Sequence, residues 1–292
     1  MTECTYVRPR TLDEAIRTLA TAGGEANILA GGVALGILMN EKLAQPTCLL
    51  DISRIDALRG IALERDGVRI GALETHHAIE SSPVVRQRMP YLADLAGEIA
   101  CGRIKNRGTI GGNVCLADPQ ADLPVAALAM GARMRAVGPR GAREIPAADF
   151  FVGVVQTALA ADELLQSILF PTPPAHSGVA FGKFGARKAM DYSSTVTVGV
   201  RLTIDPASGV VTGVGLGFGG MGVTPVRPAR TEAALTGRRL DDAAFRAAKE
   251  AIGAECEPID DDLYSAAYKT HVCAVILRRT AERALARARA AT

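Results

Sequence analysis

Three prolines within four residues, Pro171-Thr-Pro-Pro174, place the strongest constraint on how this chain can fold. Proline fixes φ and has no backbone N–H group, so such a run favours an extended connection and interrupts any helix or central strand. The chain has 292 residues, and each part flanking the prolines is long enough to bury a core of its own. We therefore predict two domains, formed by residues 1–174 and 175–292.

The part before the prolines has a mixed α+β pattern, which predicts two subdomains of about 1–58 and 59–174. Thr11-x-x-Glu14 has the spacing of a capping box that opens a helix. Asp66-Gly67 lies between two apolar runs and predicts a tight hairpin. The other elements expected here are strands at 6–8, 27–30, 47–52, 132–137 and 164–170, helical pieces over 75–100 divided by prolines, and a buried helix over 121–130.

The part after the prolines has a different pattern. Strand-like runs come first, at 179–184, 195–204 and 210–218. Helical patterns follow at 230–235, 242–253 and about 263–291. This order predicts a three-stranded sheet backed by helices.

Two glycine pairs carry the clearest chemistry in the sequence. Gly31-Gly32 follows an apolar strand and precedes a short helical turn, and Gly111-Gly112 falls in a glycine loop expected over 107–113. Glycine can adopt positive φ, so that neighbouring N–H groups converge on one anion, and a helix N-terminus adds its own donors. The pair of loops therefore predicts a clamp on the pyrophosphate of a dinucleotide, although either glycine pair taken alone could be a simple turn.

Competing nucleotide motifs are absent or out of context. The run Gly215-Leu-Gly217-Phe-Gly219-Gly220 has the G-x-G-x-x-G spacing, but Pro225 follows where a Rossmann helix should open. We interpret the run as a closely packed strand. No G-x-x-x-x-G-K-[ST] motif occurs, which excludes the P-loop hydrolases.

Composition excludes several further classes. The six cysteines form no C-x-x-C pair and the four histidines no H-E-x-x-H set, so no zinc or iron–sulfur site is expected on this chain. The net charge of +2 gives no field for nucleic acid. The apolar stretch 28–39 is too short to span a membrane and the first ten residues resemble no leader, so we expect a cytoplasmic protein. No triad or carboxylate pair is visible, and no catalytic residue is predicted.

Three polar features have ordinary interpretations. His76 and His77 would diverge by about 100° on a helix and are interpreted as a solvated helix start. Cys101 and Cys115 are interpreted as small packing residues. The arginine-rich stretch near the C-terminus is interpreted as the solvated face of a terminal helix.

Taken together, the motifs resemble a known family. Ala30-Gly31-Gly32, then Thr109 to Asn113 followed by Ala117-Asp118-Pro119, is similar to the FAD-binding medium subunit of the molybdenum hydroxylases. This is the family of aerobic carbon monoxide dehydrogenase, nicotine dehydrogenase and the flavin domain of xanthine dehydrogenase. The stretches 182–192 and 219–237 extend the resemblance over nearly the whole chain. It implies an α+β fold with a two-part FAD-binding domain of the vanillyl-alcohol-oxidase/murein-reductase (PCMH) type, followed by a three-stranded sheet with a helical bundle.

The resemblance also implies which residues hold FAD. The pyrophosphate and ribityl chain would lie among the residues of the two loops, which are Ala30, Gly31, Gly32, Val33, Ala34, Thr109, Ile110, Gly111, Gly112 and Asn113. Further contacts are expected from Asp122, Leu165 and Lys183, with Tyr192 covering the isoalloxazine and Asp191 holding the lysine or capping its turn. The family usually has polar side chains where this chain has Val33-Ala34, which leaves only backbone donors in the first loop.

The function implied by the resemblance is electron transfer within a larger complex. A large subunit would carry molybdopterin and a small subunit two [2Fe-2S] clusters, in a dimer of heterotrimers. FAD on this chain would pass electrons from the clusters to an external acceptor. Two alternatives stay open at this point, which are a self-contained flavin oxidase of the same FAD fold and a nucleotide-binding scaffold without redox function.

Overall fold

A computed structural model describes residues 4–185 and 194–291. The chain forms two compact units, and each unit is built from three separate segments of the sequence. Unit 1 comprises Met1–Leu116, Arg133–Phe150 and Thr157–Phe170, and unit 2 comprises Ala117–Ala132, Phe151–Gln156 and Pro171–Thr292. A segment that precedes the prolines thus packs with the part that follows them. The sequence boundary at residue 174 stays a prediction about domains.

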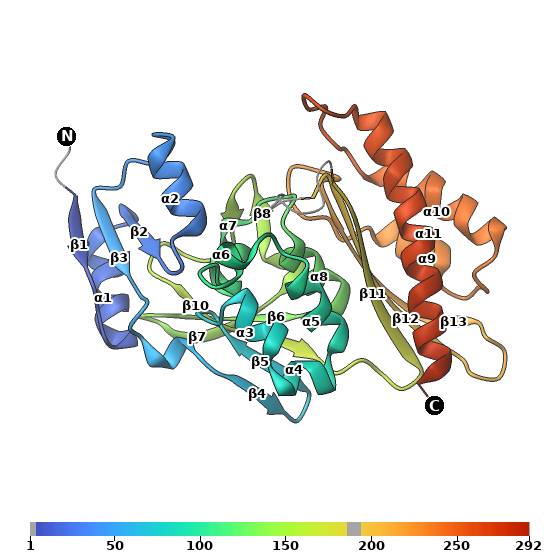
Figure 1. Cartoon of the computed structure of the whole chain (residues 1–292), viewed down its shortest axis with the longest axis horizontal. Coiled ribbons are helices and arrows are strands. Elements are labelled where there is room, and N and C mark those ends of the chain that lie inside the picture. The colour runs from blue at the N-terminus through green and yellow to red at the C-terminus, as the bar shows by residue number, and fades with distance from the viewer. Residues whose placement is uncertain (1–3, 186–193, 292) are drawn as a thin grey trace. The chain divides into compact units, whose positions relative to one another are not determined.

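Unit 1 opens with a small parallel sheet. Strands β1 (Thr5–Val7) and β2 (Ala26–Leu29) both pair in parallel with β3 (Cys48–Asp51), which lies between them. Helix α1 (Leu12–Ala22) begins at the predicted capping box and ends at Gly23 with φ of 57°. Its buried residues Ala15 and Leu19 pack in a core with leucine and isoleucine side chains from β3 and the turn after it. Helix α2 (Val33–Asn40) connects β2 to β3 (Figure 1).

The second part of unit 1 is an antiparallel sheet with the strand order β4-β5-β10-β6-β7. The predicted hairpin joins β4 (Ile61–Glu64) to β5 (Gly67–Gly71). Strand β10 (Leu164–Pro171) pairs with β6 (Arg133–Gly138), and β6 pairs with β7 (Gly141–Pro146), a strand that the sequence pattern did not indicate. Strand β7 is largely exposed and has a single buried residue, Ile145, so it lacks the apolar run that indicated its neighbour β6.

Short helices accompany this sheet. Proline opens two of them, because at the first helical position its missing N–H costs nothing. The series is α3 (His76–Ser81), α4 (Pro83–Arg88), α5 (Pro90–Gly97), α6 (Gly102–Lys105) and α7 (Ile110–Leu116). Lys105 ties three of them together, since its Nζ donates to Glu80 at 2.8 Å and to the carbonyl of Gly97 at 3.0 Å.

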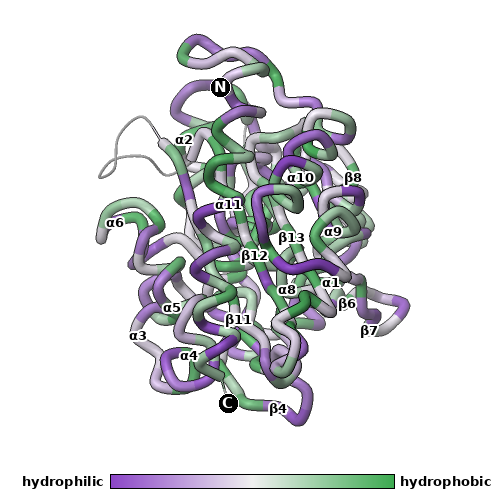
Figure 2. The backbone as a smooth tube through the Cα atoms, turned by 90° about the vertical axis from the view of Figure 1, so that its right-hand side faces the viewer, coloured by the Kyte–Doolittle hydropathy of each residue, from purple (hydrophilic) through white to green (hydrophobic). Residues whose placement is uncertain are grey.

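Unit 2 is built on an antiparallel meander of β11 (Ser177–Phe184), β12 (Val196–Ile204) and β13 (Val211–Gly219). Helix α11 (Ala266–Ala290) packs along β11 and β12 (Figure 1), and α9 (Ala229–Leu235) contacts β13. Helix α10 (Asp242–Glu255) packs on α9 and α11. Hydrophilic and hydrophobic stretches alternate along α11 (Figure 2), as expected for a helix with one face on a sheet. The core includes Phe218 and Leu277, each of which is worth about 1.5–3 kcal/mol when fully buried.

Helix α8 (Asp122–Met130) packs on β12 and β13 and belongs to unit 2. All nine of its residues are buried. The glycines of the G-x-G-x-x-G run serve this packing, because a Cβ on Gly215 or Gly217 would collide with carbonyl oxygens of α8. The run is therefore a closely packed strand, as its sequence context predicted.

Candidate functional site

The first glycine loop places the N-terminus of α2 at the end of β2. Gly32 is the N-cap of α2, with φ of 74° and no side-chain cap. The N–H groups of Val33, Ala34 and Leu35 belong to the first helical turn and have no acceptor within residues 4–185 and 194–291. Unpaired donors together with the partial positive charge of the helix end are suited to a phosphate oxygen.

The second loop differs from the expected glycine loop, because helix α7 already begins at Ile110. Its backbone N–H groups are used inside unit 1. Ile110 donates to the carbonyl of Glu74 and Gly111 to that of Ala72, each at 2.9 Å, and Gly112 donates to the hydroxyl of Thr109 at 3.1 Å. The prediction that these N–H groups converge on a phosphate is therefore wrong. Gly111 serves close packing instead, since a Cβ there would lie 2.7 Å from that of Ala72.

Side chains and an open position remain available in this second loop. The Oδ1 atom of Asn113 is buried and has no hydrogen-bond partner in the described part of the chain. Gly112 is exposed and, unlike Gly32, has no positive φ. The second loop thus presents the Asn113 amide and the Thr109 hydroxyl next to the exposed backbone of Gly112.

The fold brings the two loops into direct contact. A Cβ on Gly31 would lie 2.8 Å from the carbonyl carbon of Arg107, and nearer still to its oxygen. The Arg107 guanidinium donates from Nε and Nη2 to the carbonyl of Gly31, at 3.3 Å each. The prediction that both loops serve one site is consistent with this contact. Arg107 itself was not expected as a site residue, and only its position before a glycine-rich motif could have indicated it.

His76 lies behind the second loop and is buried, with 3% of its surface exposed. The interpretation as a solvated histidine is therefore wrong for His76, whereas its neighbour His77 is exposed. The backbone N–H of His76 donates to the carbonyl of Gly108 at 3.0 Å, which draws the first residue of α3 inward. Burial lowers the pKa of His76 from 6.5 to about 4, so the imidazole is neutral at physiological pH.

Asp122 and Lys183 meet in unit 2. Asp122 is 4% exposed at the start of α8, and its carboxylate accepts hydrogen bonds from Lys183 Nζ at 2.8 Å and from the Thr197 hydroxyl at 2.9 Å. Lys183 and Thr197 are directly paired residues of β11 and β12, so their side chains share one face of the sheet. The sequence predicted Asp122 and Lys183 as site residues but not Thr197, which carries no local signal.

The remaining predicted site residues are dispersed. Leu165 is a buried residue of β10, paired with Ala136. Its neighbour Gln166 accepts a hydrogen bond from the N–H of Ala72 at 3.0 Å, and this links β10 to the segment that holds α7. Asp191 and Tyr192 lie outside the described residues.

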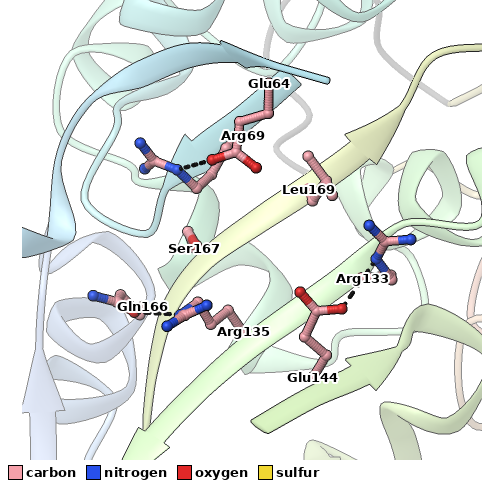
Figure 3. A pocket seen from close by; sticks show the side chains of 8 residues that line it. All are labelled: Glu64, Arg69, Arg133, Arg135, Glu144, Gln166, Ser167 and Leu169. Atoms are coloured by element: carbon pink, nitrogen blue, oxygen red, sulfur yellow. Dashed lines mark hydrogen bonds and ion pairs between the residues drawn. The ribbon is translucent and has the colours of Figure 1, made fainter. Parts of the chain in front are cut away.

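A separate pocket of about 230 Å³ lies on the five-stranded sheet of unit 1 (Figure 3). Its charged side chains bind one another. Arg69 pairs with Glu64 at 2.7 Å, Arg133 with Glu144 at 3.1 Å, and Arg135 donates to Gln166 at 2.9 Å. Most of these groups are paired with one another, although the buried Arg133 Nε makes no hydrogen bond. The lining residues lie on the strands of the sheet and include no helix N-terminus, so the pocket is not the candidate phosphate site.

Cysteines and possible metal ligands were the other candidates for a site within the described residues. No group of three histidine, cysteine or acidic side chains suited to a metal ion occurs in the described part of the chain. The packing interpretation is wrong for Cys101, which is exposed, whereas Cys115 is largely buried and its pKa is raised to about 12 by burial. Among the residues that the structure describes, no helix is long and apolar enough to cross a membrane.

A glycine loop that joins β2 to α2, in contact with a second glycine segment that joins α6 to α7, is an arrangement typical of proteins that bind a dinucleotide cofactor. Residues 2–173 match the FAD binding domain in molybdopterin dehydrogenase, and residues 180–284 match the CO dehydrogenase flavoprotein C-terminal domain. The chain belongs to the family of FAD-binding medium subunits of the molybdenum hydroxylases. The family, the FAD cofactor and the fold class inferred from the motifs are thereby confirmed.

Individual relatives cover almost the whole chain. The carbon monoxide dehydrogenase medium chain of Afipia carboxidovorans is 36% identical over 284 residues, and that of Hydrogenophaga pseudoflava is 34% identical over 282 residues. Each alignment spans 97% of both chains. The structure of carbon monoxide dehydrogenase from Hydrogenophaga pseudoflava, in a form lacking the Mo-pyranopterin moiety, superposes with a TM-score of 0.93, at 35% identity and 98% coverage of both chains.

The residues of unit 1 fit a phosphate-containing cofactor such as FAD. The unpaired N–H groups of α2 are suited to phosphate oxygens, and Gly32 at the N-cap adds no side chain beside them. The partnerless Asn113 Oδ1 is an acceptor that a ligand hydroxyl could satisfy. Val33 and Ala34 have no polar side chain, so the donors that they can offer a ligand are their backbone N–H groups.

Proposed function

We propose that this chain is the electron-transfer subunit of a molybdenum hydroxylase, which receives electrons from [2Fe-2S] clusters on a partner and delivers them to an external acceptor. The observation that carries the proposal is the contact between Gly31 and Arg107, which joins an unpaired helix N-terminus to the side chains of the second loop. The near-complete coverage of medium chains of carbon monoxide dehydrogenase supports the same role.

Each loop has a distinct task in this proposal. The N–H groups of Val33 and Ala34 hold pyrophosphate oxygens, while Thr109 and Asn113 bind the ribityl chain through their side chains. FAD, when bound, supplies the electron-accepting and electron-donating chemistry, and the protein fixes its position and surroundings. No acid or base on this chain is needed for that step. Contacts of FAD with Asp122, Leu165, Lys183, Asp191 and Tyr192 stay predictions from the family resemblance.

The partners in this proposal are a large molybdopterin-binding subunit and a small subunit with two [2Fe-2S] clusters, assembled as a dimer of heterotrimers. Relatives named medium chains indicate an assembly of several subunits. The molybdenum centre and the clusters would lie on the partners, in the cytoplasm. The residues that select the substrate would lie on the large subunit and not on this chain.

The proposal is tested with the purified complex and with the full chain alone. We expect FAD in both, and reduction of FAD by substrate only in the complex. Gly112→Val adds a side chain at an exposed position, where its Cβ would lie 3.0 Å from the Thr109 hydroxyl, and should give a folded chain with little FAD. Gly102→Val is the matched control, because Gly102 is also exposed in a short helix and a Cβ there meets nothing within 4 Å.

The outcomes separate the alternatives. Substrate oxidation by the isolated chain would identify a self-contained oxidase, and a chain without flavin in any preparation would identify a scaffold. Full FAD content in Gly112→Val would contradict the assignment of the second loop.

A further inference from the structure

The segment that leads into the N-terminal end of α11 in unit 2 (Figure 1) carries exposed apolar and acidic side chains. We define it as residues 257–268 and call it the 257–268 surface. Its apolar members Ile259, Leu263 and Tyr268 are 59%, 67% and 42% exposed. Single exposed apolar residues need no explanation, but three large ones within ten residues form a patch of the kind that binds another protein.

A buried lysine on α11 fixes the position of this segment. Lys269, which is 3% exposed, donates from Nζ to the carbonyl of Ile259 at 2.7 Å and pairs with the carboxylate of Asp261 at 2.5 Å. The other carboxylate oxygen of Asp261 accepts from the N–H groups of Leu263 and Tyr264, at 2.9 and 2.8 Å. The exposed apolar side chains thus project from a fixed backbone, which reduces the entropy lost on binding.

Aromatic rings support the same surface. Tyr264 and Tyr268 stack at a centroid distance of 5.2 Å, and Phe184 at the end of β11 meets Tyr264 edge-on at 5.4 Å. Tyrosines fixed in this way provide a large contact area at a low entropy cost. The surface therefore has rigid anchors of the kind that dominate protein interfaces.

The charges of the surface indicate its partner. Glu257, Asp260, Asp261 and Asp262 are all exposed acidic residues, and the segment 257–268 contains no lysine or arginine. Asp261 is paired with Lys269, and Asp260 accepts a hydrogen bond from the N–H of Ala266, so the acidic side chains with no partner among the described residues are Glu257 and Asp262. The chain as a whole carries +2, so this acidity is local. A complementary surface would present apolar pockets ringed by lysine and arginine.

We propose that the 257–268 surface docks this chain onto another subunit of its complex, through a basic surface with apolar pockets on that subunit. The inference rests on the proposed function, because it assigns the interface of a chain that works within an assembly. Leu263 and Tyr268 supply the contact area, and Glu257 and Asp262 supply the charge complementarity.

Binding of the FAD-loaded full chain to the remaining subunits of its complex tests this proposal. Leu263→Asp should raise the Kd at least tenfold, and Glu257→Lys/Asp262→Lys should raise it and weaken its dependence on salt. Backbone amides of 257–268 should exchange more slowly in the complex than in the free chain. Leu63→Asp is the control, because Leu63 is a 50% exposed leucine on β4 in unit 1.

Unchanged affinity of Leu263→Asp, or an equal loss in Leu63→Asp, would overturn the proposal, as would unchanged amide exchange. Sedimentation of the free chain checks a second possible occupant, because a dimer that Leu263→Asp disperses would show that the surface binds another copy of the chain. FAD content is measured in every variant. A chain that docks through this surface without FAD would contradict only the proposed function, whereas one that binds FAD but does not use the surface would contradict only this inference.

Discussion

The carbonyl group of Arg107 occupies the space that a Cβ on Gly31 would need. In return, the Arg107 guanidinium donates to the carbonyl of Gly31. Gly31 and Arg107, which are 76 positions apart, thus touch through their backbones and through one side chain. Because backbone cannot move aside as a flexible side chain can, the contact fixes the spacing of the two loops and explains the glycine at position 31.

We expect Gly31→Ala to separate the loops and to lower FAD content sharply. Relief of the overlap requires a backbone shift, which should destabilise unit 1 by about 1–3 kcal/mol. Gly36→Ala is the matched control in the same segment, because a Cβ on Gly36 in α2 meets nothing within 4 Å. Alanine in that helix should be neutral or stabilising by up to about 1 kcal/mol. Flavin absorbance per chain and urea unfolding measure both effects, and equal behaviour of the two variants would refute this role of the Gly31–Arg107 contact.

The Asp122–Lys183 pair should be strongly coupled. Lys183→Met leaves a buried carboxylate with only the Thr197 hydroxyl among the partners described above, and we expect a loss of about 2–4 kcal/mol. The double variant with Asp122→Asn should recover part of that loss. A cycle on the exposed pair Glu64–Arg69 should give less than about 1 kcal/mol. The coupling energy of each pair is measured by chemical denaturation of the single and double variants. A value near zero for Asp122–Lys183 would contradict the prediction.

His76 should make the stability of unit 1 fall as the pH decreases from 6.5 to 4. The folded pKa of about 4 lies below the ordinary 6.5, so in this window the unfolded chain binds a proton that the folded chain does not. Stability from this group is complete above pH 6.5 and declines by up to about 1.4 kcal/mol per pH unit, to a total of roughly 3 kcal/mol. His76→Gln should remove this contribution, whereas His77→Gln at the exposed neighbour should not. The slope of unfolding free energy against pH is the measurement, and identical slopes in wild type and His76→Gln would disprove it.

Local sequence signals located most elements because their causes are local. The capping box at Thr11 begins α1, the Asp66-Gly67 turn joins β4 to β5, and prolines open α4 and α5. The second glycine loop, expected over 107–113, was predicted wrongly because its structure depends on distant residues. Glycine-rich sequence permits a loop, but hydrogen bonds from Ile110 and Gly111 to distant carbonyls allow a helix to begin there.

The sequence by itself determined the family, the two glycine motifs and the elements whose hydrogen bonds close within a few residues. Only the tertiary structure decided that Gly31 meets Arg107, that His76 is buried while His77 is exposed, and that Thr197 joins Asp122 and Lys183. These relationships depend on which surfaces pack together across about 30 to 80 residues of chain. Periodicity and turn chemistry report only on neighbours in sequence, so contacts between distant segments, and the burial that shifts a pKa, arise only in the folded molecule.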